Sequence, residues 1–181
     1  EIKKKFNKLN FNLFFYNKKN LNLLYFNNLK NIIDKTKPAI IINCAAFTNV
    51  DEAELRKKEA FANNCRSVKN LTILCKEQNI YLIHFSTDFV FDGKKQKPYS
   101  EDDILNPINY YGVTKKISEK IITQNLSNYL ILRVSWVIGI HKNNFLKKIN
   151  SLLLFKDELK IVDDQLSNPT TTSTICEVLY K

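Results

Sequence analysis

Glycine is scarce in this sequence of 181 residues, which contains three glycines, Gly93, Gly112 and Gly139, all in its second half. A dinucleotide-binding α/β fold needs a glycine-rich turn after its first strand, where the pyrophosphate meets the N-terminus of a helix. The sequence contains no such turn and no methionine. Two interpretations stay open: the chain is not a nucleotide-binding protein, or the sequence begins after that turn.

Cysteine pairs are also absent. No Cys-x-x-Cys spacing occurs, so neither a zinc site nor a disulfide framework is indicated, and we expect a reducing, cytoplasmic compartment. His84 and His141 have no second histidine or carboxylate at metal-ligand spacing, so we interpret both as structural and expect no metal. The four cysteines are Cys44, Cys65, Cys75 and Cys176.

Arginine is rare: the chain contains three arginines and 25 lysines, and its net charge is +10. Proteins that read nucleic-acid sequence depend on arginine for bidentate contacts. We therefore interpret the charge as lysine spread over solvated faces and expect no nucleic-acid partner. No apolar run approaches the roughly 18 residues of a membrane span, so we expect no membrane partner either.

What the sequence does contain is an alternation of strand-like and helix-like segments. This alternation predicts an α/β fold with a doubly wound parallel sheet (Rossmann-like), in which the Ile-rich run at 39–46 is central. A long connection at 88–109 contains turn residues, and long loops in compact domains are usually functional. The predicted strands are 11–16, 39–46, 80–85, 129–135 and 159–162; the predicted helices are the end of one at 1–9, then 29–37, 50–77, 110–124, 144–154 and the start of one before residue 181.

The segment from residue 82 to residue 115 carries the candidate chemistry. An apolar strand ends in Ser86 and Thr87, and ligands of parallel α/β sheets bind at the carboxyl ends of strands. Tyr111 and Lys115 are four residues apart and share one face of a helix. Reduction of a ketone needs a proton for the developing alkoxide, and we expect the Lys115 ammonium to lower the pKa of the Tyr111 phenol. In a chain with 8 tyrosines and 25 lysines, the Tyr-x-x-x-Lys spacing alone is weak evidence.

Several motifs in order carry a resemblance to a known family. They are residues 43–54 (NCAAFTNVDEAE), 86–93 (STDFVFDG), 109–115 (NYYGVTK), 133–137 (RVSWV), 143–145 (NNF) and 162–170 (VDDQ-x-x-x-PT). Together they resemble the dTDP-4-dehydrorhamnose reductase family of extended short-chain dehydrogenases/reductases. The resemblance implies NADPH-dependent reduction of the C4 ketone of dTDP-4-dehydro-L-rhamnose, with NADH as a second option for the cofactor. It also implies that the family's glycine-rich loop and C-terminal part lie outside this sequence.

The resemblance assigns roles to residues. Thr87 would polarise the ketone, Tyr111 would donate the proton, and Lys115 would tune Tyr111 and hold the nicotinamide ribose. The expected substrate residues are Thr87, Asp88, Phe89 (where the family has Tyr) and Trp136. The expected cofactor residues are Lys18, Lys19, Asn22, Ala45, Ala46, Thr48, Ser86, Tyr111 and Lys115.

The resemblance further implies an NADP-binding domain over residues 1–162 and the start of a substrate-binding part at 163–181, with a dTDP-sugar as partner and a homodimer as one assembly. Three alternatives stay open. The first is a non-catalytic relative of the same fold, such as the regulatory beta subunit of methionine adenosyltransferase. The second is a nucleotide-sugar epimerase or dehydratase, and the third is a basic nucleic-acid binder. The combination of Thr87, Tyr111 and Lys115 favours the enzyme.

Overall fold

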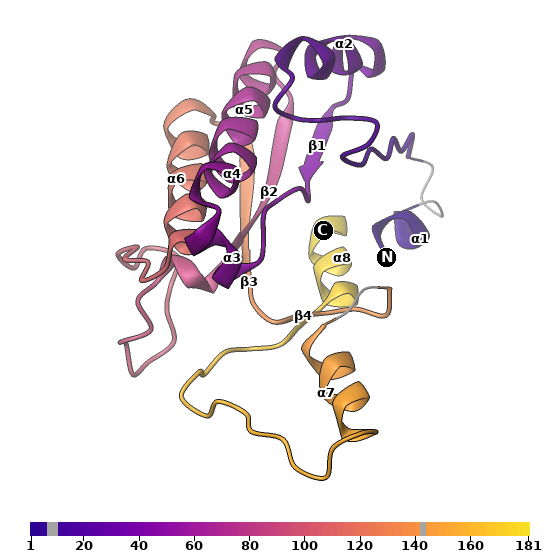
Figure 1. Cartoon of the computed structure of the whole chain (residues 1–181). Helices are drawn as coiled ribbons and strands as arrows, with labels where there is room; N and C mark the ends of the chain where they lie inside the picture. The colour runs from indigo at the N-terminus through magenta and orange to yellow at the C-terminus, as the bar shows by residue number, and fades with distance from the viewer. Residues whose placement is uncertain (7–10, 142–143) are drawn as a thin grey trace. The chain divides into compact units, whose positions relative to one another are not determined.

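A computed structural model describes residues 1–6, 11–141 and 144–181, and the chain divides into two units. The first consists of residues 1–15 and 134–181, and the second consists of residues 16–133. Figure 1 shows the elements of both. The boundary predicted between residues 162 and 163 stays a prediction.

A three-stranded sheet in the order β1-β2-β3 lies in the unit of residues 16–133, except for Val134, the last residue of β3. The strands are β1 (Ile40–Asn43), β2 (Tyr81–Thr87) and β3 (Tyr129–Val134). β1 and β2 run parallel, with Ile40 opposite Tyr81 and Asn43 opposite His84. The carboxyl ends of these two strands therefore meet at one edge of the sheet, where a ligand of such a fold binds.

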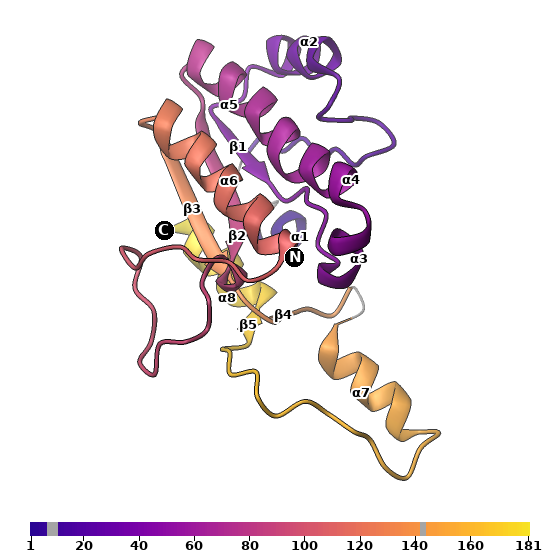
Figure 2. The same cartoon turned by 60° about the vertical axis from the view of Figure 1, so that its left-hand side comes forward.

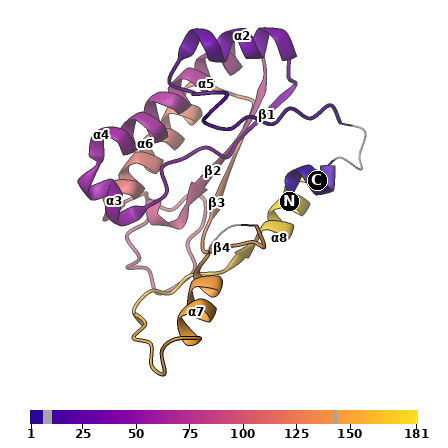
Figure 3. The same cartoon turned by 45° about the vertical axis from the view of Figure 1, so that its right-hand side comes forward.

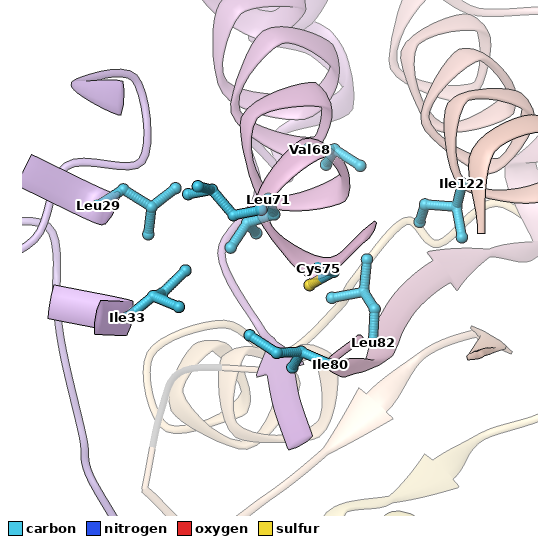
Figure 4. Close-up of a cluster of buried hydrophobic side chains, with 9 residues drawn as sticks. Leu29, Ile33, Val68, Leu71, Cys75, Ile80, Leu82 and Ile122 are labelled. Carbon is cyan, nitrogen blue, oxygen red and sulfur yellow. The ribbon is translucent and has the colours of Figure 1, made fainter. Parts of the chain in front are cut away.

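Helices α5 (Ser67–Glu77) and α6 (Tyr110–Asn125) lie side by side along one face of this sheet, as Figures 2 and 3 show. Helix α2 (Phe26–Thr36) adds a further apolar face, and its C-cap Lys37 precedes the helix-stopping Pro38. Figure 4 shows the resulting core. Its buried members are Leu29, Ile33, Val68, Leu71, Leu74, Cys75, Ile80, Leu82 and Ile122.

The helical stretch predicted at 50–77 consists of four pieces. Asn49 caps α3 (Val50–Leu55) through its side chain, and α4 (Lys57–Phe61) follows after Arg56. A π-helical turn, η1 (Ala62–Arg66), joins α4 to α5. Such turns are frequent at functional sites, because they turn side chains out of the regular helical register.

The unit of residues 1–15 and 134–181 contains less helix and strand than the other unit. It contains α1 (Ile2–Phe6), α7 (Phe145–Leu153) and α8 (Thr172–Tyr180). A short parallel pair joins β4 (Val137–Ile138) to β5 (Thr170–Thr171). The described helices include none that combines the length and the apolar character needed to cross a bilayer.

Most predicted elements are confirmed within a few residues, including the α/β class and the helices at 29–37, 110–124 and 144–154. The predicted helix end at 1–9 is confirmed as α1, and residues 7–9 lie outside the described residues.

Two predicted strands are wrong: residues 11–16 and 159–162 form no strand. A strand needs hydrogen-bonded neighbours, and the apolar side chains there stay exposed, with Phe14 at 57% and Val162 at 65%. The expectation that residues 39–46 are central is also wrong for the described sheet, where β1 is an edge strand and Ile40 is 53% exposed.

Candidate active site

The carboxyl end of β2 places the first of the predicted functional hydroxyls. Thr87 is buried, and its Oγ1 accepts a hydrogen bond from the backbone N–H of Phe89 at 3.3 Å, which starts the 3-10 turn η2 (Asp88–Val90). The same Oγ1 donates to Asp88 Oδ1 at 3.0 Å. The turn that follows the strand therefore fixes the position of the Thr87 hydroxyl oxygen.

The first turn of α6 brings Tyr111 to this hydroxyl. Asn109 caps the helix by accepting the Gly112 N–H at 2.7 Å. Helix α6 approaches η2 so closely that a Cβ on Gly112 would lie 2.1 Å from the Phe89 carbonyl oxygen. Glycine is therefore required at position 112, because any side chain there would push Tyr111 away from Thr87.

Tyr111 is buried, and its phenol interacts with the Thr87 side chain. Burial raises the pKa of Tyr111; the interaction with Thr87 opposes that rise, and the negative charge of Asp88 adds to it. The expected lowering of this pKa by Lys115 is wrong for this structure, since burial decides the direction. A raised pKa keeps the phenol protonated at neutral pH, as a proton donor requires.

Lys115 lies one helical turn further along α6 and is 1% exposed. Its Nζ donates to the Phe85 carbonyl oxygen on β2 at 2.6 Å and lies 3.1 Å from His84 Nε2. Burial lowers the pKa of Lys115 to about 8, although the nearby Glu119 and Cys65 raise it. The structure thus brings the Thr87 hydroxyl, the Tyr111 phenol and the Lys115 amine together along the last three residues of β2.

A buried amide joins this helix to the loop after β1. Asn64, in η1, accepts the Phe47 N–H at 2.7 Å and donates to the Phe47 carbonyl oxygen at 3.0 Å. It also donates to Thr114 Oγ1 on α6 at 2.8 Å. Sequence reasoning missed Asn64, because a polar residue in a helical stretch gives no signal of contacts 17 and 50 residues away.

The expected cofactor residues near the sheet edge differ in exposure. Ala45, Ala46 and Thr48 are exposed in the segment that follows the carboxyl end of β1. Ser86 is buried, and its Oγ has no hydrogen-bond partner among the described residues. A buried hydroxyl without a partner costs about 1–3 kcal/mol, so a polar ligand at this edge would relieve that cost.

The other expected cofactor residues lie in a polar turn. Lys18 and Lys19 are exposed within this turn, in which Asn17 accepts the Lys19 N–H at 2.9 Å. Asn22 Oδ1 accepts the Leu24 N–H at 3.0 Å, so that amide oxygen shapes its own loop.

The expected substrate residues fall in both units. Phe89 packs edge-on against the Tyr111 ring with centroids 6.1 Å apart, and Asp88 bonds to Thr87 as described. Trp136 belongs to the other unit, where its ring lies 4.9 Å from that of Phe145 and its backbone φ is +42°. Its role toward a sugar stays a prediction.

The connection 88–109 is organised around Asp92. Its carboxylate accepts the Lys94 N–H at 3.1 Å, the Tyr99 hydroxyl at 2.8 Å and the Asn106 amide at 3.2 Å. These hydrogen bonds, the one from Lys94 first, lower the pKa of Asp92. The turn expected at Asp92–Gly93 is confirmed, because Gly93 has a φ of +73°.

Comparisons with known proteins show the family to which the chain belongs. The family model described as "RmlD substrate binding domain" matches residues 1–181. The chain belongs to this family. It is 41% identical over 151 residues to a dTDP-4-dehydrorhamnose reductase of Aggregatibacter actinomycetemcomitans, an alignment that covers 83% of this chain and 51% of that protein.

Solved structures of the family superpose closely. A dTDP-4-dehydrorhamnose reductase of Clostridium acetobutylicum matches with a TM-score of 0.95 and 32% identity, over 99% of this chain and 64% of that one. A reductase of the same name from Bacillus anthracis, solved in complex with NADP, matches with a TM-score of 0.94 and 29% identity, over the same shares. The chain spans about half the length of the curated relatives it matches. The resemblance stated from the motifs is confirmed.

Proposed function

We propose that the protein containing this chain reduces the C4 ketone of dTDP-4-dehydro-L-rhamnose to a hydroxyl with NADPH, as a step in making a dTDP-sugar. The observation that carries the proposal is the interaction between the Thr87 side chain and the buried Tyr111 phenol, with the Lys115 amine bound to Phe85, two residues earlier on the same strand. A binding protein has no chemical need for that combination. The names of the relatives and the NADP complex of one of them support the choice of substrate and cofactor.

Each residue of the site has a distinct role in this proposal. The protonated Tyr111 phenol gives its proton to the oxygen that was the ketone, since burial keeps that proton in place at neutral pH. The Thr87 hydroxyl, whose hydrogen bonds to Asp88 Oδ1 in this structure, turns that hydrogen to the same substrate oxygen as negative charge builds there. Lys115, whose pKa is about 8, exchanges a proton readily near neutral pH and restores the one that Tyr111 loses.

The proposal also assigns residues to the cofactor. NADPH, when bound, supplies the hydride. Ala45 and Ala46 leave room beside the strand ends, and Thr48 and Ser86 offer hydroxyls. Lys18 and Lys19 would pair with a 2′-phosphate, which favours NADPH over NADH.

The test is NADPH oxidation by the protein as encoded, with any residues before Glu1 and after Lys181. We expect oxidation only when the 4-keto sugar nucleotide is present. Tyr111→Phe should lower the rate by roughly 100-fold or more, as expected for loss of a positioned general acid. Tyr110→Phe is the matched control, because Tyr110 precedes Tyr111 on the same helix, and its rate should match the unmodified protein.

Two results would count against the proposal. Equal rates for Tyr111→Phe and the unmodified protein would remove Tyr111 as the acid. Tight binding of the sugar nucleotide and NADPH without any oxidation would favour the non-catalytic relative.

A further inference from the structure

The side chain of His84, on β2, contacts both the neighbouring strand β1 and the helix α6. It is 1% exposed. Its Nδ1 lies 3.1 Å from Asn43 Nδ2 on β1, and its Nε2 lies 3.2 Å from Ser118 Oγ and 3.1 Å from Lys115 Nζ on α6. The role proposed above for the site does not use this imidazole. One of its contacts is nevertheless with the Lys115 amine.

Asn43 determines which ring nitrogen carries the proton. Its Oδ1 accepts the backbone N–H of Ala45 at 3.0 Å, so its amide nitrogen must face the ring. An amide NH2 can only donate, and His84 Nδ1 is therefore the acceptor. Burial, followed by the charge of Lys115, lowers the pKa of His84 to about 3, so the ring is neutral and its single proton sits on Nε2.

That proton faces two groups. Ser118 Oγ donates its own hydrogen to the Lys115 carbonyl oxygen at 2.7 Å, which leaves a lone pair for the His84 proton. Lys115 Nζ already donates to the Phe85 carbonyl oxygen. An ammonium has no lone pair and would place a donor against the Nε2 proton, whereas an uncharged amine accepts it.

The other titratable groups around Lys115 favour its charged form, are paired with another residue, or are neutral. On α6, Glu119 favours the charged form of Lys115, but Arg133 holds that carboxylate with contacts at 3.1 and 2.8 Å. On η1, burial raises the pKa of the Cys65 thiol to about 12, so it is neutral at physiological pH. Tyr111, one turn earlier, is protonated for the reason given above. Among the described neighbours, His84 is thus the group that presents a proton to the amine.

We propose that His84 is a positioning residue whose Nε2 proton, fixed by Asn43 and shared between Ser118 and Lys115, holds the Lys115 amine on β2 and favours its uncharged form. The consequence for catalysis rests on the proposed reductase function: an amine held in this way can take up and pass on a proton at neutral pH. The contact itself does not depend on that function.

The first measurement is the nitrogen NMR spectrum of the protein as encoded, labelled on histidine. Each histidine of this chain is identified by its own substitution, and the exposed His141 serves as an internal control. We expect His84 to show the neutral Nε2–H tautomer from acid to alkaline pH. A neutral Nδ1–H tautomer, or an imidazolium form at pH values near 6, would overturn the proposal.

The second measurement is the titration of Lys115 by NMR on labelled lysine, assigned by the resonance that Lys115→Arg removes. His84→Gln replaces a fixed donor with a side chain that can turn its carbonyl to the ammonium, so the midpoint should rise by about one pH unit, the size of one hydrogen bond. Ser118→Ala removes the competing acceptor and directs the His84 proton to Lys115, so the midpoint should fall by about half a unit.

The opposite signs distinguish this role from a merely structural one. Loosened packing would admit water and raise the midpoint in both variants, and that result would overturn the proposal, as would no change in either. Neither titration needs substrate or cofactor. Failure of the reductase proposal would appear only in the NADPH assay. If the protein is a reductase, the pH profile of NADPH oxidation by each variant should shift in the same direction as its Lys115 midpoint.

Discussion

Gly112→Ala tests the close approach that brings Tyr111 to Thr87. The added Cβ would lie 2.1 Å from the Phe89 carbonyl oxygen and 2.9 Å from Pro107 Cβ. The nearer neighbour is backbone, so either η2 or the start of α6 must move by about an ångström to restore a normal contact. Overpacking of this kind costs about 1–3 kcal/mol, and the better helix propensity of alanine returns about 1 kcal/mol. We expect a net loss of up to about 2 kcal/mol in the free energy of unfolding.

The same movement should affect catalysis more strongly than stability. Misplacing a catalytic group by about 1 Å can cost about 100-fold in rate. Chemical denaturation gives the stability, and NADPH oxidation by the protein as encoded gives the rate. Gly93→Ala is the matched control: its φ of +73° makes alanine strained, but nothing lies within 4 Å of the new Cβ. It should lose about 1 kcal/mol of stability and little activity. A Gly112→Ala protein with unchanged stability and rate would refute this account of the helix approach.

Two further predictions concern buried charge. Arg133→Met leaves the Glu119 carboxylate, which is 3% exposed, without the guanidinium that binds it at 3.1 and 2.8 Å. This change should lower the free energy of unfolding by about 3–5 kcal/mol, and the additional change Glu119→Gln should recover part of that loss. An unchanged stability of the Arg133→Met protein would contradict this prediction. Because folding lowers the pKa of His84 from 6.5 to about 3, the unfolded chain binds one more proton between these values and stability falls as the pH drops through them. Between about pH 7 and about pH 5, the unmodified protein should therefore lose about 2 kcal/mol more than His84→Gln, and equal losses would show that His84 is not held neutral.

The parts of the fold that sequence predicted well are those fixed by local pattern. Helix α6 was predictable because its helical pattern is contiguous in the chain. The pairing of Tyr111 with Lys115 followed from the same periodicity. Strand β2 was predictable because its residues are apolar and end at a turn.

The parts that sequence did not predict depend on distant partners. Residues 11–16 have the composition of a buried strand, but composition does not supply the neighbouring strand that would pair with them. The direction of the Tyr111 pKa depends on burial and on Asp88, which the spacing to Lys115 does not show. His84 lacked any signal of function because its partner Asn43 lies 41 residues earlier and Lys115 lies 31 residues later.

The central claim is that the Thr87 hydroxyl and the Tyr111 phenol act on one oxygen, and a double-mutant cycle tests it most directly. Single-turnover oxidation of NADPH by dTDP-4-dehydro-L-rhamnose is measured for Thr87→Val, Tyr111→Phe and the double variant, each in the protein as encoded. Groups that act as a unit give strongly non-additive losses, so the double variant should be little slower than the slower single variant. A double variant whose loss equals the product of the two single losses would show that the residues act independently, and would contradict the account.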